Sequence, residues 1–261
     1  MVGFRDLQAL AYACAEAVGG TLAPGDTERE AARRMRTWLK DAGVDDFFHL
    51  PFAWFGERTA LRFAHPFRFF PTSARVEEGM PFILDVAPIR GGFTADIGYS
   101  GVLGSNEVHA QLCADLEAHR DLIVDGVRSG ATLRDVYRAV DGLAARQGYE
   151  VRHKAYPGQV IAHQVARVSD SAPRFVLGFG VKGLVRLGRS VVEGVPAGWM
   201  PLWNGSKLSD HPAPHGLWAV EPHLAFRDVG AKFEEILVVD DTGAWWLDDD
   251  LPHVRAWKAT A

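Results

Sequence analysis

Apolar residues recur at helical spacing in four parts of the chain, and residues that start or stop helices bound these parts. Thr27 and Glu30 form a capping-box pattern, and Thr132 with Asp135 starts another helix in a similar way. Glycines follow several of the periodic stretches. The pattern predicts helices over residues 7–18, 27–42, 106–127 and 132–146.

Shorter apolar runs bounded by turn residues predict strands. The predicted strands cover residues 61–64, 80–86, 93–99, 149–153, 218–226 and 232–239. Gly91-Gly92 separates two of them and predicts a hairpin turn. Strands and helices mix without regular alternation, which favours an α+β fold. The segment 170–215 is rich in Gly, Pro, Ser and Trp and has no assignable pattern.

Composition places the chain among ordinary globular proteins. It has 261 residues, of which 48% are hydrophobic and 23% charged, and we expect one domain over 1–261, although two small ones also fit this length. A net charge of -5 without long Lys/Arg runs argues against nucleic acid as a partner. No apolar run approaches the roughly 20 residues that span a bilayer, and the N-terminus lacks a signal-peptide pattern. With two cysteines, we expect reduced thiols in a cytoplasmic protein that does not bind membranes.

Two aspartates interrupt apolar, strand-like stretches. Asp85 follows Phe82-Ile-Leu, and Asp96 lies in the next predicted strand. A charge in a buried strand is costly unless it is paired or bound to a metal, and adjacent antiparallel strands can bring two carboxylates to one point. The alternative is that Asp85 caps a strand end and Asp96 faces solvent.

Two glutamates and a histidine lie in the same kind of context. Glu221 follows Leu-Trp-Ala-Val and precedes Pro222, Glu234 follows Phe233, and His163 follows Val-Ile-Ala. A lone histidine there is more often a satisfied core residue than a ligand. Four clustered acids, however, require compensating positive charge. An oxygen-rich set with one imidazole suits Mn²⁺, Fe²⁺ or Co²⁺ in a shared two-metal site.

These segments resemble the pita-bread metallohydrolases, which include methionine aminopeptidase, aminopeptidase P, prolidase and creatinase. The stretch from Asp85 to Asp96 is similar to the strand pair on which that family places two ligand aspartates eleven positions apart. Gly-Leu-Trp-Ala-Val-Glu221-Pro222 resembles its Glu-Pro motif, and Phe-Glu234-Glu-Ile-Leu-Val-Val resembles its final glutamate strand. The similarity covers roughly residues 5–250.

The resemblance implies a single pita-bread catalytic domain that holds two divalent ions, Mn²⁺ first, with Co²⁺, Fe²⁺ or Zn²⁺ as alternatives. The implied metal ligands are Asp85, Asp96, His163, Glu221 and Glu234. A hydroxide between the ions would attack the scissile carbonyl, and Glu221 would relay its proton. His65 stands where the family has a histidine that contacts the substrate; the alternative is a surface-turn residue.

The expected reaction is cleavage of a C–N bond in a small peptide or amide, as in Xaa-Pro aminopeptidase or prolidase, by a homodimer. Two alternatives stay open: a hydrolase of a non-peptide amide or amidine, as creatinase is, and a metal-free binding module on the same fold. Asp170 stands where the peptidases often carry a second histidine, which favours a compact, donor-rich substrate. Trp199, Trp203 and Trp218 are candidates for an aromatic wall over it.

Overall fold

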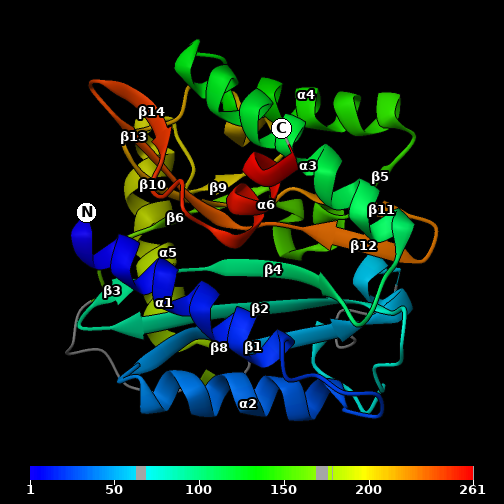
Figure 1. Cartoon of the computed structure of the whole chain (residues 1–261). Helices are drawn as coiled ribbons and strands as arrows, with labels where there is room; N and C mark the ends of the chain where they lie inside the picture. Colours follow the sequence, from blue (N-terminus) through cyan, green and yellow to red (C-terminus); the bar gives the residue numbers. More distant parts are fainter. Residues whose placement is uncertain (63–68, 169–175, 178, 261) are drawn as a thin grey trace.

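The computed structural model describes residues 1–62, 69–168, 176–177 and 179–260. Its strands lie between helices that cover them from opposite sides (Figure 1). Helix α2 packs against β1 and α1 packs against β2, whereas α3 packs against α4, β12 and β14. The helices are α1 (Val2–Gly19), α2 (Glu28–Asp41), α3 (Glu107–Arg128), α4 (Leu133–Gln147), α5 (Val181–Gly194) and α6 (Pro252–Thr260). The predicted α+β class is confirmed.

The starts of three helices follow the capping chemistry of the sequence. Thr27 accepts a hydrogen bond from the Glu30 backbone N–H, and the Glu30 carboxylate accepts one from the Thr27 N–H, which completes the predicted capping box. Asn106 caps α3 and Thr132 caps α4 through the same side-chain acceptor role. All four predicted helices are present, and their bounds match closely except that α1 begins at Val2 rather than at residue 7.

One sheet has the strand order β3-β2-β1-β8-β7, with β4 also paired to β2. Its strands are β1 (Asp46–Phe55), β2 (Pro81–Arg90), β3 (Phe93–Thr94), β4 (Ile97–Val102), β7 (Val176–Leu177) and β8 (Phe179–Gly180). The predicted hairpin joins β2 to β3 and β4 through Gly91 and Gly92, whose φ angles of 56° and 77° suit a tight hairpin turn.

Two further sheets complete the strand arrangement. A second sheet has the order β14-β13-β10-β6-β9, and a third has the order β12-β11-β5. Their strands are β5 (Glu150–Val151), β6 (Ala162–Val165), β9 (Leu202–Trp203), β10 (Gly216–Val220), β11 (His223–Phe226), β12 (Val229–Lys232), β13 (Glu235–Asp240) and β14 (Gly243–Trp246). An isolated bridge joins Gly98 of β4 to Glu234, the residue directly before β13. It links the first sheet to the second.

Four strand predictions are corrected. Leu61 follows the 3₁₀ helix Gly56–Ala60 with a left-handed φ of 46°, so no strand begins there, and residues 63–64 lie outside the described residues. The strand predicted over 149–153 is limited to β5, because a 3₁₀ helix begins at His153. The runs 218–226 and 232–239 each divide into two strands that belong to different sheets.

The strand β1 was absent from the sequence prediction. Its pairing with β2 sets His49 opposite Ala87 and Phe52 opposite Asp85, so β1 carries one extra residue between these pairs. This bulge accommodates Pro51 and places His49 and Phe52 on one face, where their rings stack at 4.7 Å. The same bulge breaks the alternation by which a strand is recognised in a sequence.

Candidate active site

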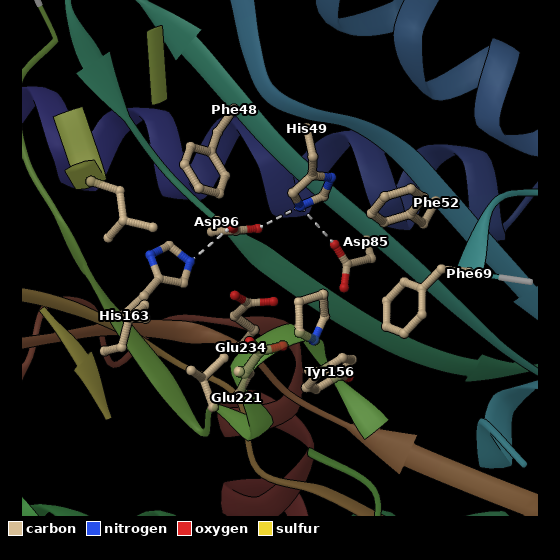
Figure 2. Close-up of a pocket in the computed structure, with 15 residues that line it drawn as sticks. Phe48, His49, Phe52, Phe69, Asp85, Asp96, Tyr156, His163, Glu221 and Glu234 are labelled. Atoms are coloured by element: carbon tan, nitrogen blue, oxygen red, sulfur yellow. Dashed lines mark hydrogen bonds and ion pairs between the residues drawn. The ribbon is translucent and has the colours of Figure 1, made fainter. Parts of the chain in front are cut away.

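Four carboxylates from separate segments converge between the sheets (Figure 2). The β2–β4 register sets Asp85 opposite Gly98, and Asp96 stands two residues before Gly98, so both aspartates lie on the same side of the sheet. The bridge from Gly98 to Glu234 brings the third acid alongside. All four side chains are buried: Asp85, Asp96, Glu221 and Glu234.

Both glutamates lie where the chain passes from one sheet to another. Glu221 stands with Pro222 between β10 and β11, and Glu234 stands with Phe233 between β12 and β13. The sequence pattern treated each of them as a residue inside one continuous strand. Their position at the crossings explains why both side chains reach the region where the sheets meet.

His163 lies on β6, opposite Ala219 of β10. Its Nε2 is 3.2 Å from Oδ2 of Asp96, while its Nδ1 lies 3.3 Å from the backbone oxygen of Gln164. The structure therefore brings the five residues named from the sequence into one cluster. Together with His49, these residues form three groups of three, and within each group the possible ligand atoms lie within 4.8 Å of one another, as metal ligands do.

His49 is a member of the cluster that sequence reasoning missed. Its Nε2 lies 3.1 Å from Oδ1 of Asp96 and 3.2 Å from Oδ1 of Asp85. Its Nδ1 lies 2.8 Å from the oxygen of Leu50 and donates to it, because a carbonyl only accepts. The available signal was a histidine in the apolar run Phe47-Phe48-His49-Leu50, which is the context that singled out His163.

Both histidines have the geometry of metal ligands. Ligating histidines usually donate their other ring N–H to a carboxylate or backbone carbonyl, which fixes the ring and leaves one nitrogen free for the cation. His49 and His163 direct Nδ1 to a neighbouring carbonyl and Nε2 to Asp96. A divalent cation fits the groups His49–Asp85–Asp96 and Asp96–His163–Glu234.

Lys232 is the second member that sequence reasoning missed. Its Nζ donates to Asp85 Oδ2 at 2.8 Å, Glu221 Oε2 at 2.8 Å and Glu234 Oε2 at 2.9 Å. These acids are also a candidate metal group, and one oxygen of each lies against the ammonium. From the sequence, we expected metal ions alone to supply the compensating positive charge. A lysine two residues before Glu234, and so on the same side of an extended chain, was the available signal.

The charges in the cluster shift one another's pKa values. Burial raises the pKa of Glu234 well above its ordinary value, and the charges of Asp96 and Glu221 add to this effect. Burial also raises the pKa of Glu221, although Lys232 acts in the opposite direction. For Asp96, burial is outweighed by His49 and His163, which lower its pKa.

A cavity of about 420 Å³ opens above these groups (Figure 2). Aromatic and aliphatic side chains form its walls: Phe48, Phe52, Phe69, Tyr156, Val160, Leu187 and Leu202. The carboxylates and the two histidines lie together, with Phe48 to one side of them and Phe52 and Phe69 to the other in this view. An apolar chamber with convergent polar groups is the usual form of a site for a small molecule.

Tyr156 is fixed in this wall by a buried hydrogen bond. His223 Nε2 lies 2.8 Å from the backbone oxygen of Thr59 and must donate to it, so neutral His223 accepts at Nδ1 from the Tyr156 hydroxyl, also at 2.8 Å. Burial and the Lys232 charge lower the pKa of His223 well below its ordinary value, which favours this neutral form. The Tyr156 ring then stands 5.0 Å from Lys232 Nζ, within cation–π range.

The expected tryptophan wall is wrong for two of its three members. Trp203 and Trp218 are fully buried and pack edge-to-face at 6.2 Å, and Trp203 donates to the backbone oxygen of Leu133. Their size and apolar surface are used in the core. His65 and Asp170, which were assigned substrate-contacting roles, lie outside the described residues.

The chain belongs to metallopeptidase family M24, whose family model matches residues 3–241. The prediction of a metallopeptidase of the pita-bread class is thereby confirmed. No curated protein matches the chain in sequence. Within the described part of the chain, no helix combines the length and apolar character needed to cross a membrane.

Solved structures of the family share the fold. The X-Pro aminopeptidase of Thermotoga maritima MSB8 aligns over 94% of this chain and 59% of its own, with a TM-score of 0.69 and 15% identity. The prolidase of Pyrococcus furiosus aligns over 94% and 62%, with a TM-score of 0.67 and 16% identity. The methionine aminopeptidase of Rickettsia prowazekii aligns over 94% and 95%, with a TM-score of 0.62 and 14% identity. The chain thus spans less than two thirds of the first two proteins.

Proposed function

We propose that this chain is a metal-dependent hydrolase that cleaves a C–N bond in a small peptide or amide, in the manner of an Xaa-Pro aminopeptidase or prolidase. The observation that carries the proposal is that the cluster of four acids and two histidines lines a cavity of about 420 Å³ whose other walls are mostly apolar. Membership of family M24 supports a hydrolytic role, and the names of the similar structures suggest the bond type.

Asp85, Asp96, His163, Glu221 and Glu234 are the proposed metal ligands, and His49 is added to them from its distances to two of the aspartates. A divalent ion held by these groups would supply Lewis acidity to the scissile carbonyl. The sequence-based expectation of two ions, with Mn²⁺ first, stays a prediction at this point, as do the homodimer and the cytoplasmic location.

The chain's own residues have distinct tasks in this proposal. Phe52 and Phe69 present aromatic surface on which an apolar side chain or a proline ring of the substrate can pack, and the apolar walls exclude water around it. Glu221 accepts the Lys232 N–H at Oε2, which leaves Oε1 as the atom that takes a proton from the water attacking the carbonyl carbon and returns it to the leaving nitrogen. The raised pKa of Glu221 suits this exchange.

A turnover panel tests the proposal. Purified protein supplied in turn with Mn²⁺, Co²⁺ and Zn²⁺ is assayed on Ala-Pro and Met-Ala peptides, on small amides and on amidines. We expect metal-dependent turnover of one class with kcat/KM near or above about 10⁴ M⁻¹s⁻¹, the lower end of typical enzymes. Asp96→Asn, which removes the charge shared by both histidine groups, serves as the inactive control. A folded, metal-loaded protein without turnover on any class would contradict the proposal.

The panel also separates the substrate classes that the sequence leaves open. Cleavage of Ala-Pro places the chain with the Xaa-Pro enzymes, whereas cleavage of an amidine alone supports the creatinase-like alternative. Because the cavity walls are apolar, substrates that differ only in the size of an apolar group should differ in KM more than in kcat.

A further inference from the structure

Hydrogen bonds hold both the backbone and the side chain of Lys232 in the cluster. Its backbone N–H donates to Ser100 Oγ at 2.8 Å, and the same hydroxyl donates to the Lys232 backbone oxygen at 2.7 Å. Its side chain is fully buried and ends at the three carboxylate contacts described above. An ammonium has three N–H donors, and here each has one carboxylate oxygen within hydrogen-bond distance.

Gly98 provides the space for this side chain. A Cβ added at Gly98 would overlap Lys232 Cε and lie 3.0 Å from Cδ and 3.1 Å from Nζ. The backbone of Gly98 lies outside the left-handed region, so its conformation does not itself require glycine. The contact with Lys232 is therefore the physical reason for a glycine at this position.

We propose that the Lys232 ammonium takes the place of one of the two cations, so that the chain holds a single divalent ion bound at Asp96. The candidate group Asp85–Glu221–Glu234 already surrounds Nζ, and each of its acids gives the ammonium one oxygen. A divalent ion on those oxygens would stand beside a buried positive charge, where the low dielectric makes repulsion strong.

The ligands that remain are the two groups that share Asp96. They retain Asp85 Oδ1, which faces His49, and both oxygens of Asp96, one toward each imidazole. These ligands include the imidazole nitrogens of His49 and His163, whereas the group around the Lys232 ammonium consists of carboxylates only. The remaining set therefore favours ions that accept imidazole, such as Zn²⁺, Co²⁺ or Fe²⁺, over Mg²⁺ or Ca²⁺.

Metal stoichiometry tests the inference. The full chain is saturated with Mn²⁺ or Zn²⁺, passed through a desalting column and analysed by native mass spectrometry with elemental analysis. We expect one ion per chain in the parent and two in Lys232→Met, which keeps the length of the side chain without its charge. Lys207→Met, on the exposed surface, is the matched control and should stay at one ion. Equal numbers in the parent and Lys232→Met would overturn the inference.

A second measurement needs no variant, because Lys232→Met may leave carboxylates without a partner and reduce folding. The electron paramagnetic resonance spectrum of the Mn²⁺-loaded parent should show the hyperfine pattern of an isolated ion. An exchange-coupled pair, or a parent that binds no ion, would overturn the inference. Neither measurement uses a substrate, so both stand apart from the hydrolase proposal, which the turnover panel decides.

Discussion

Asp96 Oδ1 lies 3.1 Å from His49 Nε2, and this contact joins β1 to the acidic hairpin of β2 and β4. His163 makes the matching contact with the other oxygen of Asp96, from β6 of a different sheet. Asp96 is thus the carboxylate that contacts both imidazoles. Changes at this residue and its partners give the sharpest tests of the site.

Asp96→Asn should remove most of the thermal stabilisation that a divalent ion provides. An ion that binds only the folded chain stabilises it by about 2.7 kcal/mol at roughly 100 times its Kd, which raises Tm. The amide keeps the shape of the side chain but loses the charge. Differential scanning fluorimetry with and without Mn²⁺ measures the shift, with exposed Asp125→Asn as the control. An unchanged metal-dependent shift in Asp96→Asn would show that the ion binds elsewhere.

His49→Gln should weaken metal binding by at least about tenfold, the lower end of the effects seen when partners of metal ligands are removed. The change removes the Nε2 that faces Asp85 and Asp96. Isothermal titration with Zn²⁺ gives Kd directly. His215→Gln, whose parent side chain is 61% exposed, should bind as the parent does. Equal affinities in His49→Gln and the parent would make His49 a packing residue.

Gly98→Ala should destabilise the chain by about 1–3 kcal/mol, the usual cost of overpacking, because the added Cβ overlaps the Lys232 side chain. The cause is tested by a double-mutant cycle. In a Lys232→Ala background, Gly98→Ala should cost much less, since the methyl group then enters the vacated space. Urea unfolding of the four proteins supplies the free energies. An equal cost in both backgrounds would assign the strain to another neighbour.

His109 should make the folded chain sensitive to acid. Burial lowers its pKa from 6.5 to about 4, so between these values the unfolded chain binds a proton that the folded chain does not. The free energy of unfolding therefore falls as pH falls through this window, by up to about 3 kcal/mol. Urea unfolding from pH 7 to pH 4 should show a shallower fall for His109→Leu. Above pH 7 the two proteins should have the same pH slope, and equal slopes throughout would contradict the assignment.

Chemical character made part of the site predictable from the sequence. Asp85, Asp96 and Glu234 are charged residues in apolar surroundings, and such residues require a partner wherever the chain folds. The capping residues Thr27 and Thr132 act locally, through backbone groups three positions away, so a short window contains their whole effect.

The residues that were missed depend on relations that a short window does not contain. His49 reaches the cluster because a bulge in β1 turns it to the face of Phe52, and the bulge is visible only against the register of β2. Lys232 resembles an ordinary residue at the end of an apolar strand until the fold brings Asp85 and Glu221, from two other segments, against its side chain beside Glu234. Trp203 and Trp218 were assigned to the site but lie in the core, because a large aromatic residue suits either a core or the wall of a ligand site.

The crossings at Glu221 and Glu234 determine which changes of chain length the site tolerates. Each acid stands at the junction of strands from two sheets, so its place depends on both registers. Inserting one residue in β10 would turn every following side chain to the opposite face, and Glu221 would leave the cavity while β10 still buried apolar surface. The turn over residues 240–242, between β13 and β14, is exposed and follows both junctions in the chain, so it has no such constraint. Inserted segments and the new termini of a circular permutation should therefore be placed there.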